Sequence, residues 1–437
     1  MRLSLSNSTC LRFETHWQGV LQKRRGLDAL LDTIENLQGA PLPASLLEAT
    51  VLPARLQKYS PSDLDTLIAA GEVVWCGFDS LGEHDGRIGL YLSDRIAALL
   101  PPRSPADASL SEKEQAISDQ LARGGAMFFA QLHDAAGGGY PGETLDALWN
   151  LVWRGLLSND TFHALRADVA KPSAERRAKR EHNLPAFRSR RTTPPAAQGR
   201  WGLVPRPDRG TAAQQTEWSH ALALQLLNRY GILTREMAAA ENFPGGFSAV
   251  YDVLKALEES GRVRRGYFVA GLGAAQFALP AAVDLLRGLR NDPEKPEMLV
   301  LAATDPANVY GSVLRWPQAV DTSLTRSVGA SVVLRNGELV AYMRRNNPSV
   351  QVFLPDEEPD RSHAARDLAA LLAQSAQEGL RQDMDHRGGL LISSINGQPV
   401  HEHWLARFLI DTGFAPAPNG FNVRRVATPS ASATRNG

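Results

Sequence analysis

Two short polar runs offer the residue types that hold metal ions or take part in catalysis. Asp356-Glu357-Glu358-Pro359 resembles a Mg²⁺-binding acidic box, but prolines flank it and the chain contains no G-x-x-x-x-G-K-[ST] phosphate loop. His401-Glu402-His403 places two imidazoles two residues apart in an expected helix, where such side chains do not share a face. We therefore expect an exposed turn at the first run and no metal site at the second. No G-x-S-x-G elbow is present either, so the sequence shows no self-evident catalytic motif and no cofactor site.

The densest group of charged side chains is a basic segment near the middle of the chain. Residues 165–200 contain ten lysines and arginines and three acids, a net charge of +7, although the whole chain has 47 residues of each sign. Four prolines prevent this segment from forming a single helix. Cationic side chains that neutralise phosphates release counterions, so we expect an extended wing that binds the DNA backbone; the alternative is a solvated linker. The candidate phosphate-binding residues are Arg176, Arg177, Lys179, Arg180, Arg188, Arg190 and Arg191.

A second set of candidates is Arg262, Arg264 and Arg265, which lie on a strand expected to lead into another wing. They either contact DNA or form the outward face of an alternating strand. The two helices that would read base edges, Glu143–Arg154 and Gly246–Ser260, are not basic, whereas helices in the major groove usually present Arg, Lys, Asn or Gln. This composition favours contacts through the wings and disfavours a transcription regulator.

The elements that carry these residues repeat three times as helices, a strand, a turn and a return strand, which is the order of a winged helix. The third copy is the clearest. An amphipathic helix covers Trp218–Tyr230 and ends at a glycine, and a second apolar stripe follows it. Arg262–Phe268 and Gln276–Leu279 are the two expected wing strands.

The first and second copies have the same ending. In the first, Ser60 is the expected helix cap, Pro61 suits the first helical position, and Glu72–Cys76 begins the wing. In the second, Leu156–Asn159 is the first wing strand, but its return strand, Arg200–Val204, comes only after the basic segment. The basic segment is therefore an insert in the second wing.

Beyond residue 293 the pattern changes to short strands, two helices and an Asn336-Gly337 dipeptide that suits a type I′ hairpin turn. The predicted fold class is α+β, with tandem winged-helix modules followed by a small antiparallel β-barrel-like domain. We expect winged helices at 11–105, 106–208 (with the insert at about 160–200) and 209–292, a barrel-like domain at 293–426, and a disordered tail at 427–437.

Cysteine content and hydropathy indicate the compartment. Cys10 and Cys76 are the only cysteines, too few for a disulfide scaffold, which favours a reducing environment. No apolar run approaches the roughly 20 residues that a membrane helix needs. We expect a cytoplasmic protein without a membrane partner.

Several long collinear motifs resemble the bacterial Lhr-type (large helicase-related) proteins, and the likeness covers residues 11–426. They are Val51-Leu52-Pro53-Ala54-Arg55, Gly71-Glu72-Val73-Val74-Trp75, Arg123–Phe129, Leu145–Trp153, Val253–Phe268, Gly271–Leu279 and Leu299–Asn308. The resemblance implies the C-terminal region of an ATP-dependent 3′-to-5′ DNA repair helicase, with DNA as partner and with self-assembly into a homo-oligomer, a tetramer. It also implies that ATP and Mg²⁺ act in a helicase core upstream, which agrees with the missing phosphate loop.

The expected array of winged helices with a barrel also resembles the architecture of the alkylpurine-type DNA glycosylases. These enzymes carry a Gln-x-Gln catalytic signature. Gln131-Leu132-His133 matches only the first glutamine of that signature. Gln131 is therefore a catalytic candidate only under the alternative that the chain excises damaged or deaminated bases. The other reading of Gln131 is a structural residue on a helix.

Overall fold

The computed structural model describes residues 2–5, 7–101, 109–170, 193–206, 210–273, 275–291, 293–319, 323–382 and 390–423. The chain divides into two units, the first comprising residues 1–290 and 304–314 and the second comprising 291–303 and 315–437. Within the described ranges, no helix combines the length and apolar composition that crossing a bilayer requires.

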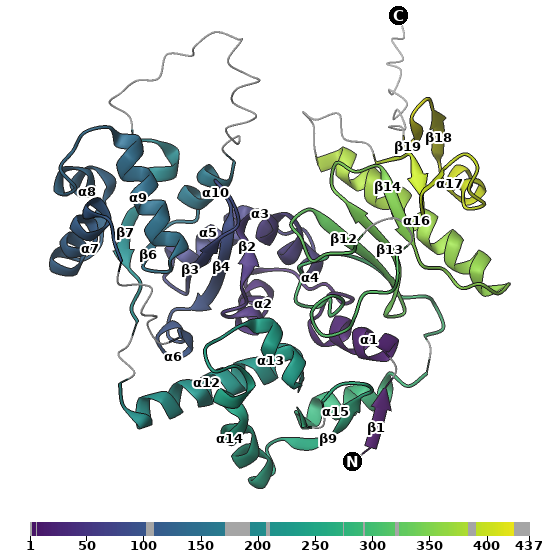
Figure 1. The fold of residues 1–437 in the computed structure, drawn as a ribbon, viewed down its shortest axis with the longest axis horizontal. Helices are drawn as coiled ribbons and strands as arrows, with labels where there is room; N and C mark the ends of the chain where they lie inside the picture. The colour runs from purple at the N-terminus through teal and green to yellow at the C-terminus, as the bar shows by residue number, and fades with distance from the viewer. Residues whose placement is uncertain are drawn as a thin grey trace, which may run out of the picture. The chain divides into compact units, whose positions relative to one another are not determined.

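The first unit begins its repeats with a winged helix that has the expected element order (Figure 1). Its three strands form one sheet in the order β2-β4-β3. The helix before the wing starts as the sequence predicts, with Pro61 at its first position and the Asp63 carboxylate accepting a hydrogen bond from the Ser60 backbone nitrogen. The elements are α2 (Leu27–Leu37), β2 (Leu42–Pro43), α3 (Ala44–Leu46), the π-helical turn η1 (Leu47–Val51), α4 (Leu52–Arg55), α5 (Pro61–Ala69), β3 (Val73–Ser80), β4 (Gly86–Leu92) and α6 (Ile96–Leu99).

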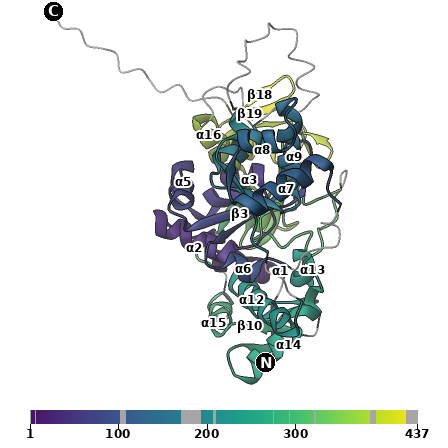
Figure 2. The same ribbon diagram turned by 90° about the vertical axis from the view of Figure 1, so that its left-hand side faces the viewer.

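The second winged helix has its wing split by the insert. Its sheet has the order β5-β7-β6, and the return strand pairs antiparallel with the first wing strand through Leu157 opposite Leu203. Helices α7, α8 and α9 lie together in both views (Figures 1 and 2). The elements are α7 (Glu112–Gly124), β5 (Met127–Phe128), α8 (Phe129–Ala135), α9 (Pro141–Trp153), β6 (Leu157–Asn159), α10 (His163–Val169), the 3-10 turn η3 (Pro195–Ala197) and β7 (Arg200–Leu203).

The third winged helix includes an element that the sequence did not indicate. The N-terminal strand β1 (Arg2–Leu5) pairs parallel with β9, so the sheet has the order β1-β9-β10-β8. Helix α1 (Asn7–Trp17) follows, and its Phe13 lies in one apolar cluster with Phe268. The other elements are α12 (Ala212–Tyr230), β8 (Ile232–Leu233), α13 (Arg235–Glu241), α14 (Gly246–Glu259), β9 (Arg264–Val269), β10 (Gln276–Ala278) and α15 (Pro280–Gly288).

The first and second modules share one hydrophobic core. Trp75 of β3 packs edge-on against Phe162 at 5.9 Å between ring centroids, and both belong to a cluster that extends through α2, α5, α7 and α9. A glycine allows the closest approach, because a Cβ atom on Gly77 would lie 2.1 Å from the carbonyl oxygen of Val152 at the end of α9. These two modules therefore fold as one packed body.

The second unit consists of short strands and two helices. One sheet has the order β11-β12-β13-β14-β16-β17 and another β15-β19-β18. The hairpin at Asn336 and Gly337 has φ angles of 51° and 79°, as the expected type I′ turn requires. Neither sheet closes on itself within the described residues, so the barrel expected from the sequence is not confirmed. The elements are β11 (Met298–Ala302), β12 (Ala330–Arg335), β13 (Glu338–Arg344), β14 (Ser349–Val352), α16 (Asp360–Gln382), β15 (Leu391–Ile392), β16 (Ser394–Ile395), β17 (Gln398–Pro399), α17 (Ala406–Asp411), β18 (Phe414–Ala417) and β19 (Gly420–Val423).

Candidate nucleic-acid interface

The wing of the second module is framed by β6 and β7, whose antiparallel pairing brings both ends of the basic insert to the same end of this strand pair. The seven candidate cations of the insert, Arg176, Arg177, Lys179, Arg180, Arg188, Arg190 and Arg191, lie outside the described residues. The described arginines at either end of the insert have carboxylate partners. The positive charges of these arginines are therefore balanced within the protein.

Arg166 of α10 is bound to the first module. Its Nε lies 2.6 Å from Glu48 Oε2, and its Nη1 lies 2.8 Å from Asp65 Oδ2. The hydroxyl of Tyr59 donates to the same Glu48 carboxylate at 2.5 Å. Burial alone would lower the pKa of Arg166, but the hydrogen bonds to Glu48 and Asp65 raise it. Arg166 therefore holds the start of the insert against the first module.

At the other end of the insert, Arg200 lies on β7 and its Nε is 2.7 Å from Asp160 Oδ2. The Asp160 carboxylate also accepts a hydrogen bond from the Arg200 backbone nitrogen at 2.7 Å. The charge of Arg200 is thus balanced at the wing itself.

The third wing displays all three predicted arginines on its surface, since Arg262, Arg264 and Arg265 are all exposed. Arg265 has partial partners, because its guanidinium lies 4.0 Å from Glu258 and 5.9 Å from the ring centroid of Phe277. Among the described residues, Arg262 and Arg264 have no salt-bridge partner. These two guanidiniums are therefore available to a phosphate.

The two helices that would read base edges are α9 and α14. The first is mostly buried, and the second has no excess of positive charge. Most of α9 is buried, including Leu148, Leu151 and Val152. On α14, Lys255 lies 3.8 Å from Glu259, one turn away. Neither helix presents a row of base-reading side chains, in agreement with the sequence analysis.

Gln131 is exposed and occupies the first turn of α8, where its Oε1 accepts a hydrogen bond from the Phe128 backbone nitrogen at 3.1 Å. His133 makes a separate contact, with Nδ1 at 2.8 Å from Thr144 Oγ1 and its ring stacked on Phe129. The two residues of the partial signature therefore make separate contacts.

The two polar runs of the C-terminal part also have structural roles. The acidic run is exposed, and Glu358 accepts hydrogen bonds from the first turn of α16 at the Ser362 nitrogen and hydroxyl. His403 is buried, which lowers its pKa, and its Nδ1 accepts from the Leu405 nitrogen. His401 instead packs edge-on against Phe421. Within the described ranges no group of three metal-ligating side chains gathers.

A cavity of about 260 Å³ lies between the first and third modules, and no motif in the sequence indicates it. Its polar lining includes the Asp79–Arg87 ion pair, with Arg87 Nε 2.7 Å from Asp79 Oδ1. A second pair, Arg229 and Glu241, lies at the opposite module, and Arg229 is 2% exposed. Burial lowers the pKa of Arg229, whereas Glu241 raises it. Its Nε is buried and has no hydrogen-bond partner among the described residues. The aromatic lining residues are Phe78, Tyr91, Trp218 and Phe243.

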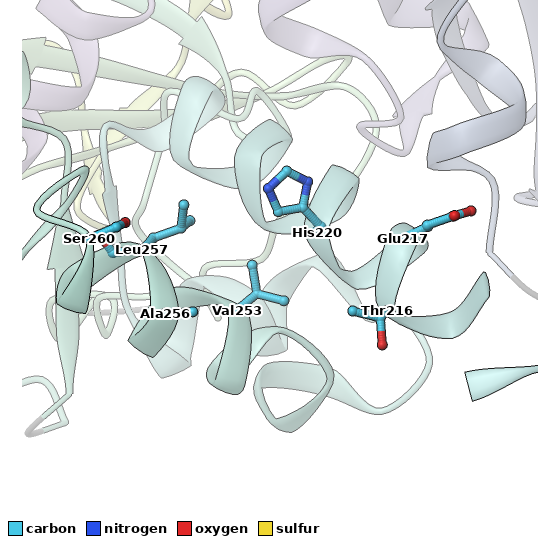
Figure 3. A pocket seen from close by; sticks show the side chains of 7 residues that line it. All are labelled: Thr216, Glu217, His220, Val253, Ala256, Leu257 and Ser260. Carbon is cyan, nitrogen blue, oxygen red and sulfur yellow. The ribbon is translucent and has the colours of Figure 1, made fainter. Parts of the chain in front are cut away.

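A larger, more apolar groove of about 470 Å³ lies between α12 and α14 (Figure 3). Val253, Ala256 and Leu257 line one side, and Thr216 and His220 line the other. This lining offers mainly hydrophobic contact, and it presents no arrangement of side chains that suggests catalysis.

Two segments match family models, residues 5–93 and residues 212–298, and both models are described as "Large helicase-related protein, winged-helix domain". The first segment contains α1 and the first module up to β4, and the second contains α12 to α15 of the third module. The resemblance to the Lhr-type proteins is confirmed. Two segments of this chain are winged-helix domains of the large helicase-related family.

Comparison with curated proteins extends the Lhr relationship over nearly the whole chain. The chain is 36% identical over 96% of its length to the "Lhr helicase/ probable uracil glycosylase" of Mycolicibacterium smegmatis, and 35% identical over 91% of its length to the "Lhr helicase/uracil glycosylase" of Escherichia coli. It covers 28% and 26% of those proteins, so it spans about a quarter of the relatives that it matches.

A solved structure shares the fold of this Lhr-related chain. The Streptomyces sahachiroi DNA glycosylase AlkZ aligns with a TM-score of 0.52 at 14% identity, over 85% of this chain and 97% of that protein. At this identity the likeness concerns the fold alone. The tandem winged-helix architecture is therefore common to both.

Proposed function

We propose that this chain is the non-motor, C-terminal region of an ATP-dependent 3′-to-5′ DNA repair helicase that acts in the cytoplasm. In this proposal a helicase core elsewhere in the longer protein uses ATP and Mg²⁺, while these modules bind DNA and assemble copies of the protein. The relationship to Lhr helicases over about a quarter of their length supports it. So do the winged-helix domains, a fold that commonly binds DNA.

The observation that carries the DNA-binding proposal is the contrast between wings and helices. The third wing exposes Arg262 and Arg264, while α9 is largely buried and α14 has no excess of cations. Guanidinium groups without a carboxylate partner bind phosphate in a salt-dependent, sequence-independent way. We therefore expect the wings to grip the backbone and base reading to be weak.

Neutralising the middle of the insert tests this proposal. In a variant with Arg176, Arg177, Lys179 and Arg180 all changed to glutamine, the salt dependence of duplex binding by the full chain should become markedly shallower. Fluorescence anisotropy across a salt series measures it. An unchanged slope would refute phosphate binding by the middle of the insert.

Self-assembly is tested separately. Multi-angle light scattering of the purified chain at micromolar concentration should give a mass several times the 47.5 kDa of one copy, four times for the proposed tetramer. A strict monomer would refute assembly through these modules.

A second candidate function is base excision, because both curated relatives are named as uracil glycosylases, one of them as probable, and the structural neighbour is named as a DNA glycosylase. The cavity between the first and third modules combines aromatic walls with the Asp79–Arg87 pair. Enzymes that excise a base extrude it into such a pocket, stack it between aromatic rings and read its polar edge. A carboxylate such as Asp79 would serve there as a base toward water.

An abasic-site assay distinguishes the possible sites. Incubation with uracil-containing oligonucleotide followed by alkali should produce cleaved strands if the chain excises uracil. Loss of product in Asp79→Asn but not in Gln131→Ala would place the activity in the cavity, and the reverse result would place it at α8. Absence of product from the unmodified chain would exclude this candidate.

A further inference from the structure

An exposed indole, Trp404, lies among several arginines on the second unit, where α16 and α17 pack together (Figure 1). Trp404 lies two residues before α17 and is 38% exposed, and its ring meets the buried ring of Phe408 edge-on at 6.0 Å between centroids. Ile410, on the same helix, is 49% exposed. We call the surface formed by Trp404, Phe408 and the arginines around them the Trp404 patch.

Three guanidinium groups cover the rings of the Trp404 patch. Arg361 of α16 lies 5.2 Å from the Trp404 ring centroid. Arg366 and Arg407 lie 5.7 Å and 4.6 Å from the centroid of Phe408. A guanidinium stacked on a ring keeps its N–H edges free for an acceptor in the same plane.

The charge of the Trp404 patch is only partly balanced. Arg361 pairs with Glu358 at 3.1 Å, an exposed pair that contributes little. Arg366 and Arg407 are exposed and have no salt-bridge partner among the described residues, and the neighbouring acid Asp367 is occupied by Arg335 at 2.8 Å. An anionic partner would therefore meet two free guanidiniums beside a half-exposed indole.

We propose that the Trp404 patch binds a single strand of nucleic acid, with phosphates on Arg366 and Arg407 and a base stacked at Trp404. Sequence-tolerant binding of single strands uses this combination of aromatic faces and cations. An acidic peptide would use the cations but gain little from the indole, so the observations favour the nucleic acid. The site lies in the second unit and goes beyond the proposed function, which places DNA on wings of the first unit.

The test uses the full chain and a labelled oligothymidine strand of about 20 nucleotides. Trp404→Ala should weaken binding about fivefold or more, whereas Trp404→Phe, which keeps a ring, should retain most of the affinity. The double variant Arg366→Gln/Arg407→Gln should lower the slope of log affinity against log salt by about 1.4. Arg315→Gln, an exposed arginine of the same unit outside the patch, is the matched control and should change neither quantity.

A crosslinking measurement needs no substitution. A strand that carries 5-iododeoxyuridine, irradiated in complex with the unmodified chain, should yield a crosslinked peptide that contains Trp404. Unchanged affinity for the strand in the patch variants, or crosslinks only elsewhere, would overturn the proposal. So would variants that keep their affinity for the strand but bind an acidic peptide or anionic vesicles less tightly than the unmodified chain. If the chain binds duplex but no single strand, only this proposal fails; if it binds neither, the proposed function fails with it.

Discussion

Removing the carboxylate of Asp305 should destabilise the first unit more than any surface charge change. Asp305 Oδ1 and Oδ2 receive both terminal nitrogens of Arg55 at 2.8 Å and 2.9 Å, and the side chains are 1% and 3% exposed. Arg55 also donates to Gln18 Oε1 at 2.9 Å, and Asp305 accepts from the Ala307 nitrogen. The pair thus ties residues 304–314 to the first module.

The magnitude follows from what Asp305→Ala leaves behind. The guanidinium of Arg55 would stay buried and lose two charge-assisted hydrogen bonds, which costs about 3–5 kcal/mol of unfolding free energy for a buried pair. Asp32 provides a matched control, because its pair with Arg24 at 2.6 Å has side chains 55% and 65% exposed. Asp32→Ala should cost less than about 1 kcal/mol.

Urea unfolding of the full chain, followed by far-ultraviolet circular dichroism, measures both variants against the unmodified chain. The double variant Arg55→Met/Asp305→Leu should recover a large part of the loss, because an apolar pair of similar volume leaves no unpaired buried charge. A cost for Asp305→Ala as small as that of Asp32→Ala would refute the reasoning.

Two further predictions concern packing and pH. Gly77→Ala should destabilise the shared core by about 1–3 kcal/mol, because its Cβ would lie 2.1 Å from the Val152 carbonyl oxygen, whereas Gly82→Ala, with nothing within 4 Å, should be neutral in the same denaturation assay. Burial raises the pKa of Glu14 well above its ordinary value, and the hydrogen bond from Gln18 only partly opposes this shift. Above the pKa of the unfolded chain, about 4.3, the unfolded state loses the Glu14 proton while the folded state keeps it, so the fold loses stability as pH rises. Glu14→Gln should therefore raise the urea midpoint at neutral pH and have little effect near pH 4. Equal effects of the two glycine variants, or a pH-independent Glu14→Gln effect, would contradict these predictions.

Local signals in the sequence predict much of the first unit. Helix α5 begins at Pro61 as expected, with the Asp63 carboxylate accepting from the Ser60 nitrogen at 3.3 Å. The delayed return strand of the second wing, expected at Arg200–Val204, forms at Arg200–Leu203 and pairs with the first wing strand. Caps, glycine stops and strand alternation act over a few residues, so they can be read without the fold.

Features that depend on distant residues could not be read in this way. The pairing of β1 with β9 and the partners of Arg166 and Arg200 all arise from tertiary contacts. Counting charge along the basic segment therefore overstated the number of free cations. The cavity between the first and third modules takes its residues from both, and only the folded chain brings them together.

The most direct test of wing-mediated DNA binding removes both sets of wing cations at once. A variant with Arg176, Arg177, Lys179, Arg180, Arg262 and Arg264 changed to glutamine should lower the slope of log affinity against log salt for duplex DNA by about 5, at roughly 0.9 for each lost phosphate contact. Arg200→Gln, whose charge is balanced by Asp160, should leave that slope unchanged. A six-site variant with the slope of the unmodified chain would contradict the account, because the phosphates would then be held elsewhere.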